Sequence, residues 1–164
     1  MNDCMWIVAK VKNKEIGLLK NSFKNLLGSI PEFYMPKISF EKIVKNKILK
    51  FDNFILGDYI FIKHRKFEDI DVMSSLRYLK GLDYVLPFVK SSQDEISSFI
   101  LKCKDNENEL GYLTQNFFNL IINEKFNFNS GPFVKFIGEI LELQKNRIRV
   151  LVGNYTVSIN SKKS

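Results

Sequence analysis

Short strand-like segments alternate with amphipathic helical segments over the first 103 residues. Residues 5–12 pass from a continuous apolar run to strict alternation, which is typical of a strand. Residues 14–27 repeat apolar side chains every three or four positions, which predicts a helix that ends at Gly28. The same criteria predict a strand over 33–36, a hairpin over 42–51 turning near Asn46, a strand over 54–62, a helix over 69–78, a strand within 84–89 and a helix beginning at 91–95. These elements predict an α+β fold in which an antiparallel sheet is flanked by helices.

Charge and composition change together along the chain and divide it into three parts. Residues 1–103 hold 17 basic and 12 acidic side chains, residues 104–124 hold one and four, and residues 125–164 hold seven and two. We therefore expect an amino-terminal domain over 1–103, an acidic linker over 104–124 and a second domain over 125–164. In this last part Gly and Asn separate short apolar segments, and Arg147–Val152 alternates strictly, which predicts a small carboxy-terminal β-barrel.

Composition excludes several classes of protein. The net charge of +7 favours a polyanionic partner. The apolar runs are too short for a membrane span or a signal-peptide core, so we expect a cytoplasmic protein. Cys4, Cys103 and the single histidine, His64, cannot build a disulfide framework or a structural zinc site, and they leave no obvious catalytic triad. We expect no metal and no cofactor, and interpret the acidic residues Glu68, Asp69 and Asp71 as a helix start rather than a magnesium site.

Two sets of segments resemble a known family. Residues 130–140, SGPFVKFIGEI, followed by RIRVLV at 147–152, resemble the KOW motif. They follow WIVAK at 6–10, FYMP at 33–36, DYIFI at 58–62 and LRYLKG at 76–81, whose order looks like the amino-terminal domain of NusG. The chain thus resembles the NusG family of transcription elongation factors over nearly its whole length, and especially the specialised antitermination branch typified by RfaH. It departs from the family pattern at Leu56–Tyr59, where the usual proline is missing, and after Val152, where the end is short.

The resemblance implies a monomeric, non-enzymatic bacterial regulator that binds elongating RNA polymerase and suppresses pausing. It assigns contact with the β′ clamp helices to Tyr59, Phe61 and Phe88, and contact with the β gate loop to Ser74 and Ser75. Non-template DNA would meet Lys12, Lys14 and Lys80. The KOW core would comprise Gly131, Pro132, Phe133, Phe136 and Gly138, and Tyr155 would contact Rho or a small-subunit ribosomal protein.

Other interpretations remain open at this point. The aromatic residues assigned to the clamp serve equally well as ordinary core, and the lysines as solvated surface. A ribosome-associated KOW-type RNA-binding protein is the main alternative function, in which the lysine-rich hairpin over 42–51 contacts rRNA phosphates. A small Mg²⁺-dependent nucleic-acid enzyme built on Glu68, Asp69 and Asp71 is a third. Because β-branched residues alternate over 147–152, we expect a constitutive barrel rather than a helical form of this segment.

Overall fold

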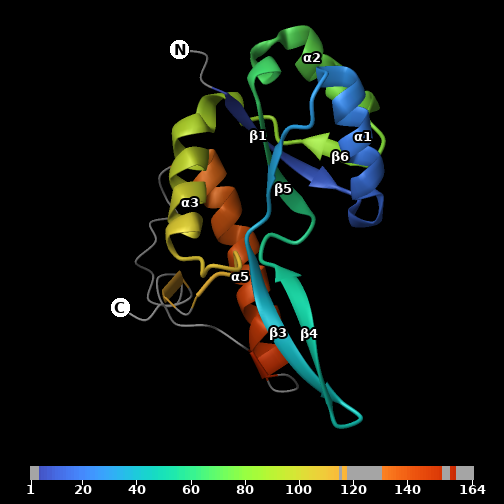
Figure 1. The fold of residues 1–164 in the computed structure, drawn as a ribbon. Coiled ribbons are helices and arrows are strands. Elements are labelled where there is room, and N and C mark those ends of the chain that lie inside the picture. The colour runs from blue at the N-terminus through green and yellow to red at the C-terminus, as the bar shows by residue number, and fades with distance from the viewer. Residues whose placement is uncertain (1–3, 115, 118–130, 153–155, 158–164) are drawn as a thin grey trace. The chain divides into compact units, whose positions relative to one another are not determined.

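The computed structural model describes residues 4–114, 116–117, 131–152 and 156–157 (Figure 1). The chain divides into two compact units, Met1–Met35 with Asp58–Ile96, and Pro36–Gly57 with Ser97–Ser164. We call them unit 1 and unit 2. The expected domain boundaries at 103 and 124 are not tested by this division and stay a prediction. The coarser expectation, an α+β protein with antiparallel sheets and helices, is confirmed.

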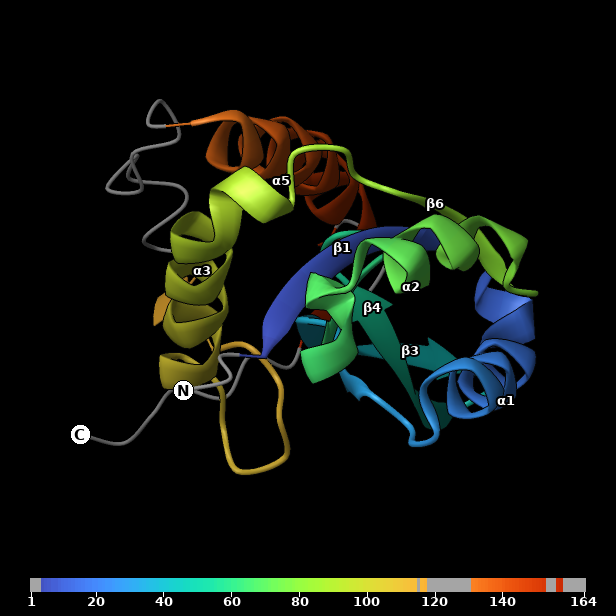
Figure 2. The same cartoon turned by 90° about the horizontal axis from the view of Figure 1, so that it is seen from above.

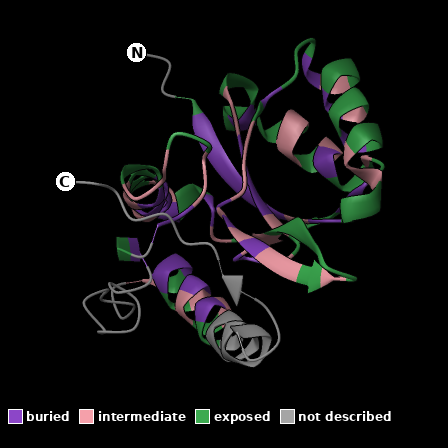
Figure 3. Cartoon of the chain, turned by 60° about the horizontal axis from the view of Figure 1, so that its bottom comes forward, coloured by how far each residue is buried: buried purple, intermediate pink, exposed green. Residues whose placement is uncertain are grey.

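Unit 1 is built on a four-stranded antiparallel sheet in the order β2-β5-β1-β6. Its strands are β1 (Met5–Val11), β2 (Glu32–Tyr34), β5 (Tyr59–His64) and β6 (Leu82–Val85). β1 lies between β5 and β6 and is buried along nearly its whole length, as the purple strand after the N-terminus in Figure 3 shows. A central strand covered on both faces has a continuous apolar sequence rather than an alternating one, as residues 5–9 do.

Helix α1 (Ile16–Leu27) packs on one face of this sheet, beside β1 and β6 (Figures 1 and 2). Its apolar stripe, Leu19, Phe23 and Leu27, is buried, and the ring of Phe23 meets Phe33 of β2 edge-on at 5.9 Å. Gly28 ends the helix in the left-handed conformation at φ 82°, where its N–H donates to the carbonyl of Lys24. The predicted helix and its glycine cap are both confirmed.

Shorter helical elements complete unit 1. They are η1 (Asn13–Glu15), η2 (Arg65–Glu68), α2 (Ile70–Ser75), η3 (Leu76–Tyr78) and η4 (Lys90–Ser92). The helix expected over 69–78 is therefore present as α2 and η3, but Ile70 is exposed and only Leu76 of its predicted apolar face is buried. Phe88 and Val89, expected in a strand, follow β6 in a turn. Helix α3 (Gln93–Asp105) begins in unit 1 and continues into unit 2.

Unit 2 contains a hairpin of β3 (Lys37–Val44) and β4 (Lys47–Phe54), with the two-residue strand β7 (Thr156–Val157) beside β3. Lys45 and Asn46 connect the two long strands, and both have positive φ, as a type I′ turn requires. The predicted hairpin and its turn at Asn46 are confirmed. The strand predicted over 54–62 is only partly right, because Phe54 ends β4 and β5 begins at Tyr59.

Helix α5 (Pro132–Val152) contradicts the strand predicted over Arg147–Val152. Proline is well suited to the first position of a helix, and the N–H of Lys135 closes the first turn on the carbonyl of Gly131. Phe133, Ile137 and Leu141 follow at four-residue spacing and are all buried. The rest of the predicted barrel, residues 125–130, 153–155 and 158–164, lies outside the described residues. None of the described helices is both long enough and apolar enough to cross a membrane.

Candidate functional site

An aromatic row crosses three strands of the unit 1 sheet. Lys10 of β1 lies opposite Tyr59 of β5 on one side and opposite Tyr84 of β6 on the other, so the three residues share one face. The two phenol rings meet edge-on at 6.4 Å, and their hydroxyls are 2.6 Å apart. We call Lys10, Tyr59 and Tyr84 the aromatic row. Tyr84 is 42% exposed, so the row reaches the surface.

Tyr59 is held in its protonated form. Burial raises its pKa to about 12, aided by the hydroxyl of Tyr84 and by the negative charges of Asp83 and Asp58. A phenol with this pKa is neither a base nor a nucleophile at neutral pH. The aromatic row therefore has the chemistry of a docking surface, with flat apolar rings, phenolic hydroxyls and one cation.

The other two aromatic residues assigned to the clamp are placed differently. Phe61 lies two residues after Tyr59 on the same strand face, but it is completely buried and its ring contacts Trp6 and Tyr34. It supports this face from within and offers no surface of its own. Phe88 is half-buried in the turn after β6, separate from the strands that carry the row.

Gln93 at the start of α3 fixes the backbone of β1. Its side-chain oxygen accepts the N–H of Trp6 at 2.9 Å, and its side-chain nitrogen donates to the carbonyls of Trp6 and Val89, each at 2.7 Å. One amide side chain thus takes the place of a neighbouring strand where β6 does not extend. Nothing in the local sequence marked Gln93 for this role, because the contact joins positions 87 residues apart.

The three lysines assigned to DNA contribute to one corner of unit 1. The N–H of Lys12 donates to the carbonyl of Gly81, the residue after Lys80, and Lys14 lies in η1 directly after Lys12. All three lysine side chains are exposed. Gly81 has φ 89°, and a Cβ there would lie 2.8 Å from the carbonyl oxygen of Glu15, so this close approach requires glycine. We call Lys12, Lys14 and Lys80 the basic corner.

The basic corner adjoins the aromatic row in the sequence and in the sheet. Lys10 is in β1, and Lys12 directly follows the last residue of that strand, Val11. The N–H of Val11 donates to the carbonyl of Asp58, the residue before Tyr59. Asp58 also accepts from the side-chain amide of Asn13. The resemblance assigned roles to the three lysines and to Tyr59 but not to Lys10 or Tyr84, whose place beside Tyr59 only the strand register reveals.

Ser74 and Ser75, assigned to the gate loop, lie in α2. Both hydroxyls donate to the carbonyl of Asp71, at 2.9 and 2.8 Å, so they close the helix on itself. Ser74 is exposed and Ser75 half-buried. Asp69 caps the same helix by accepting the N–H of Asp71, which confirms the helix-start interpretation of the acidic residues. In the described part of the chain, no group of three His, Cys, Asp or Glu residues is placed to hold a metal ion.

His64 does not form a catalytic dyad with the serine beside it. Its Nδ1 accepts the N–H of Lys66 at 3.1 Å, so Nε2 carries the proton and donates to Ser29 Oγ at 2.9 Å. A histidine in this tautomer cannot take a proton from that serine through Nε2. Burial, Arg65 and Lys66 also lower the pKa of His64, which keeps the ring neutral. His64 is a cap for η2.

The residues expected in the KOW core begin helix α5. Phe133 is buried and meets Phe99 of α3 edge-on at 6.0 Å, and Phe136 is half-buried. Gly131 precedes the helix, Pro132 opens it, and Gly138 lies in its interior rather than in a turn. Tyr155 lies outside the described residues. Of the residues that the resemblance assigned to the KOW core, Pro132, Phe133, Phe136 and Gly138 are thus helical here, and Gly131 directly precedes the helix.

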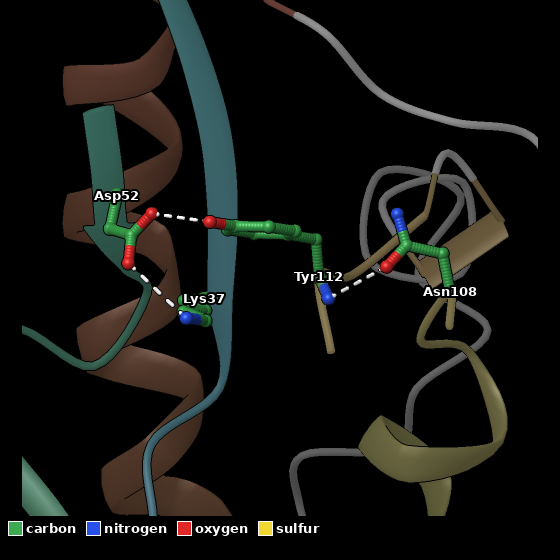
Figure 4. Close-up of polar contacts among 4 residues, drawn as sticks. All are labelled: Lys37, Asp52, Asn108 and Tyr112. Carbon is green, nitrogen blue, oxygen red and sulfur yellow. Dashed lines mark hydrogen bonds and ion pairs between the residues drawn. The ribbon is translucent and has the colours of Figure 1, made fainter. Parts of the chain in front are cut away.

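A polar cluster in unit 2 was not predicted from the sequence (Figure 4). Asp52 of β4 accepts from the hydroxyl of Tyr112 at 2.6 Å and pairs with Lys37 at 3.2 Å, and Lys37 Nζ lies 4.7 Å from the centre of the Tyr112 ring. Asn108 Oδ1 accepts the N–H of Tyr112. The hydrogen bond from Tyr112 is the largest effect that lowers the pKa of Asp52, and the hydrogen bond and positive charge of Lys37 lower it further. These contacts fasten part of the expected linker to the hairpin.

Comparison with known proteins adds no family to these observations. A scan against models of protein families finds no match, and a search of curated proteins finds no relative.

Proposed function

We propose that the chain is a NusG-like transcription elongation and antitermination factor that binds RNA polymerase and non-template DNA. The observation that carries the proposal is the adjacency, in unit 1, of the aromatic row and the basic corner. Aromatic side chains at a surface are typical of protein interface centres, whereas exposed lysines bind phosphates as point charges. One surface with both properties suits a protein that touches a polymerase and its nucleic acid at once.

The proposal keeps the roles that the resemblance assigned, except that Tyr84 and Lys10 join the clamp contact and Phe61 leaves it. Tyr59, together with Tyr84 and Lys10, contacts the clamp, and Phe88, in the turn after β6, keeps the clamp contact that the resemblance assigned to it. Phe61 packs beneath the face because it has no exposed surface. Ser74 and Ser75 face the gate loop, and Lys12, Lys14 and Lys80 hold DNA phosphates without reading bases. The protein acts by stoichiometric binding in the bacterial cytoplasm, and catalysis belongs to the polymerase.

A second half of the proposal concerns the carboxy-terminal residues 125–164. In a NusG-like protein this part is a KOW-type barrel that recruits Rho or a ribosomal protein, and Tyr155 is its candidate contact. Helix α5 is the conformation described for residues 132–152. The amino-terminal half of the proposal does not depend on the barrel.

The test is titration of the full chain onto a stalled elongation complex. Tyr84→Ala removes an exposed ring, and Lys12→Glu with Lys80→Glu reverses the basic corner. We expect weaker binding from each variant and a reduced dependence of affinity on salt for the lysine variants. Lys24→Glu, an exposed lysine of α1, is the matched control and should bind as the unmodified chain does. Undiminished binding of both test variants would refute the proposed surface.

Ribosome association is a second candidate because one specific observation favours it. Lys45, Lys47 and Lys50 are exposed at the end of the hairpin, as an RNA contact requires. Binding to ribosomal subunits that is lost on replacing these three lysines by glutamate, without binding to the elongation complex, would favour this function instead.

A further inference from the structure

The end of the hairpin exposes large apolar side chains. Ile43 and Ile48 are 67% and 64% exposed, and Leu49 and Phe51 are 44% and 47% exposed. At the base of the same hairpin, by contrast, Ile38 and Phe40 are buried. Apolar side chains gathered on one exposed element are a sign of an interaction surface.

Strand β4 is also an edge of its sheet in the described part of the chain, where the order is β4-β3-β7. The N–H of Ile55 donates to the carbonyl of Pro36, so these two residues form a hydrogen-bonded pair. Hydrogen-bonded and non-hydrogen-bonded pairs alternate along an antiparallel ladder. Odd-numbered residues of β4 therefore direct their backbone groups toward β3. The backbone groups of Ile48, Lys50 and Asp52 point away from β3, toward the open edge.

The apolar residues of β4 lie on both faces of the ribbon. Ile48 lies opposite Ile43 and shares its face, whereas Leu49 and Phe51 belong to the other face. A helix or a flat surface laid on the ribbon would cover one face only. A strand added along the edge would place neighbours beside the side chains of both faces and would satisfy the open backbone groups.

We propose that this strand comes from a second copy of the chain, so that two β4 strands pair antiparallel about a two-fold axis at Phe51. In this register Lys50 lies opposite Asp52 of the second copy, and Ile48 lies opposite Phe54 of the second copy. Opposite charges and apolar pairs therefore meet across the axis, twice each by symmetry. The inference departs from the monomer expected from the sequence and does not rest on the proposed function.

Charge and hydrogen-bond alternation together favour this register, because an axis at Leu49 or Asn53 would set a charged side chain opposite an apolar one instead of pairing opposite charges. A shift by one residue would set the even-numbered residues of one β4, whose backbone groups point away from β3, opposite odd-numbered residues of the other, whose backbone groups are already bonded to β3. Such a pairing cannot form a ladder. Centring the axis on Lys50 or on Asp52 would place like charges directly opposite each other, which is destabilising. Lysines on an edge strand usually prevent such pairing. Here Lys50, which lies 3.7 Å from Glu41 of its own hairpin, would also lie opposite the Asp52 carboxylate of the second copy, which keeps its contacts with Lys37 and Tyr112.

A pair of cysteine variants tests the register directly. In a Cys4→Ser background, which removes the exposed native thiol, Phe51→Cys places two thiols opposite each other in a non-hydrogen-bonded pair. The Cα atoms of such a pair are about 4.5 Å apart, within the range of a disulfide. Leu49→Cys is the matched control, because Leu49 has similar exposure and lies on the same face but opposes Asn53 of the second copy. We expect a disulfide-linked dimer from Phe51→Cys and not from Leu49→Cys.

Sedimentation equilibrium of the full chain gives an independent readout. Ile48→Lys should raise the dimer dissociation constant about tenfold or more, because two cross-strand pairs are lost and a charge is added at the edge. Ile43→Lys, on the same face but one strand further from the axis, should raise it much less. A chain that stays monomeric at the concentration of the cross-linking experiment, or equal cross-linking by the two cysteine variants, would overturn the inference. The inference would also be overturned if the chain stayed monomeric and bound nucleic acid or another protein along β4.

Discussion

Replacing Gln93 by methionine tests how unit 1 is held together. Methionine preserves the length of the side chain but removes all three hydrogen bonds that Gln93 makes to the backbone of Trp6 and Val89. Trp6 and Val89 are both buried. Each buried polar group left without a partner costs about 1 to 3 kcal/mol, and partial access of water reduces the sum. We expect Gln93→Met to lower the free energy of unfolding by about 3 kcal/mol.

Urea denaturation measures this loss conveniently, because Trp6 is the single tryptophan of the chain and reports on its own surroundings. With a denaturant slope of about 2 kcal/mol per molar urea, the midpoint should fall by about 1.5 M. Ser98→Met, at an exposed position of the same helix, is the control and should shift the midpoint by less than about 0.3 M. A loss below about 1 kcal/mol in Gln93→Met would refute the reasoning, since water would then replace the amide without penalty.

Four further predictions follow from single side chains. Thr114 is completely buried and its hydroxyl has no hydrogen-bond partner among the described residues, so Thr114→Val should raise stability by up to about 1 kcal/mol in urea denaturation. Tyr112→Phe should raise the pKa of Asp52 toward 3.8, as a carboxylate titration by NMR would measure. The pKa of His64 in the folded chain lies below 6.5. The stability that its neutral ring contributes is therefore present above pH 6.5 and is lost as the pH falls from there through the folded pKa. His64→Asn should flatten this part of the curve of urea midpoint against pH. Gly138 lies inside α5, so Gly138→Ala should stabilise the chain by about 0.5 to 1 kcal/mol, whereas a glycine in a barrel turn would give a loss in the same assay.

Local sequence pattern predicted the elements whose signals are local. The four-residue spacing of α1, its glycine cap, and the turn at Lys45–Asn46 depend on neighbours within one or two turns of chain, and all three are confirmed. Which segments share a compact unit is not a local property of the sequence. Hairpin β3–β4 belongs with residues 97–164 rather than with the strands that flank it in sequence, and this depends on long-range packing.

The candidate site was predicted only in part for the same reason. Lys12, Lys14 and Lys80 were assigned through the resemblance, which places basic residues after the first strand and before the last one. Tyr84 and Lys10 could not, because their relation to Tyr59 is a matter of register between β5, β1 and β6. A one-residue shift in either ladder would turn the partners to opposite faces.

Residues 147–152 show why the helix α5 was missed and what decides such a segment. Their strict alternation favours a strand, but a strand gains stability only when a neighbour supplies hydrogen bonds and side-chain contacts in register. A helix begun at Pro132, with Phe133 and Leu141 buried, has already met the unfavourable cost of nucleation, and each added residue then gains a hydrogen bond within its own segment. The spacing of Leu141, Ile148 and Val152 also follows the helical period. Six residues with three β-branched side chains at the end of an anchored helix therefore extend the helix, and the same residues would form a strand only where partner strands are supplied to them.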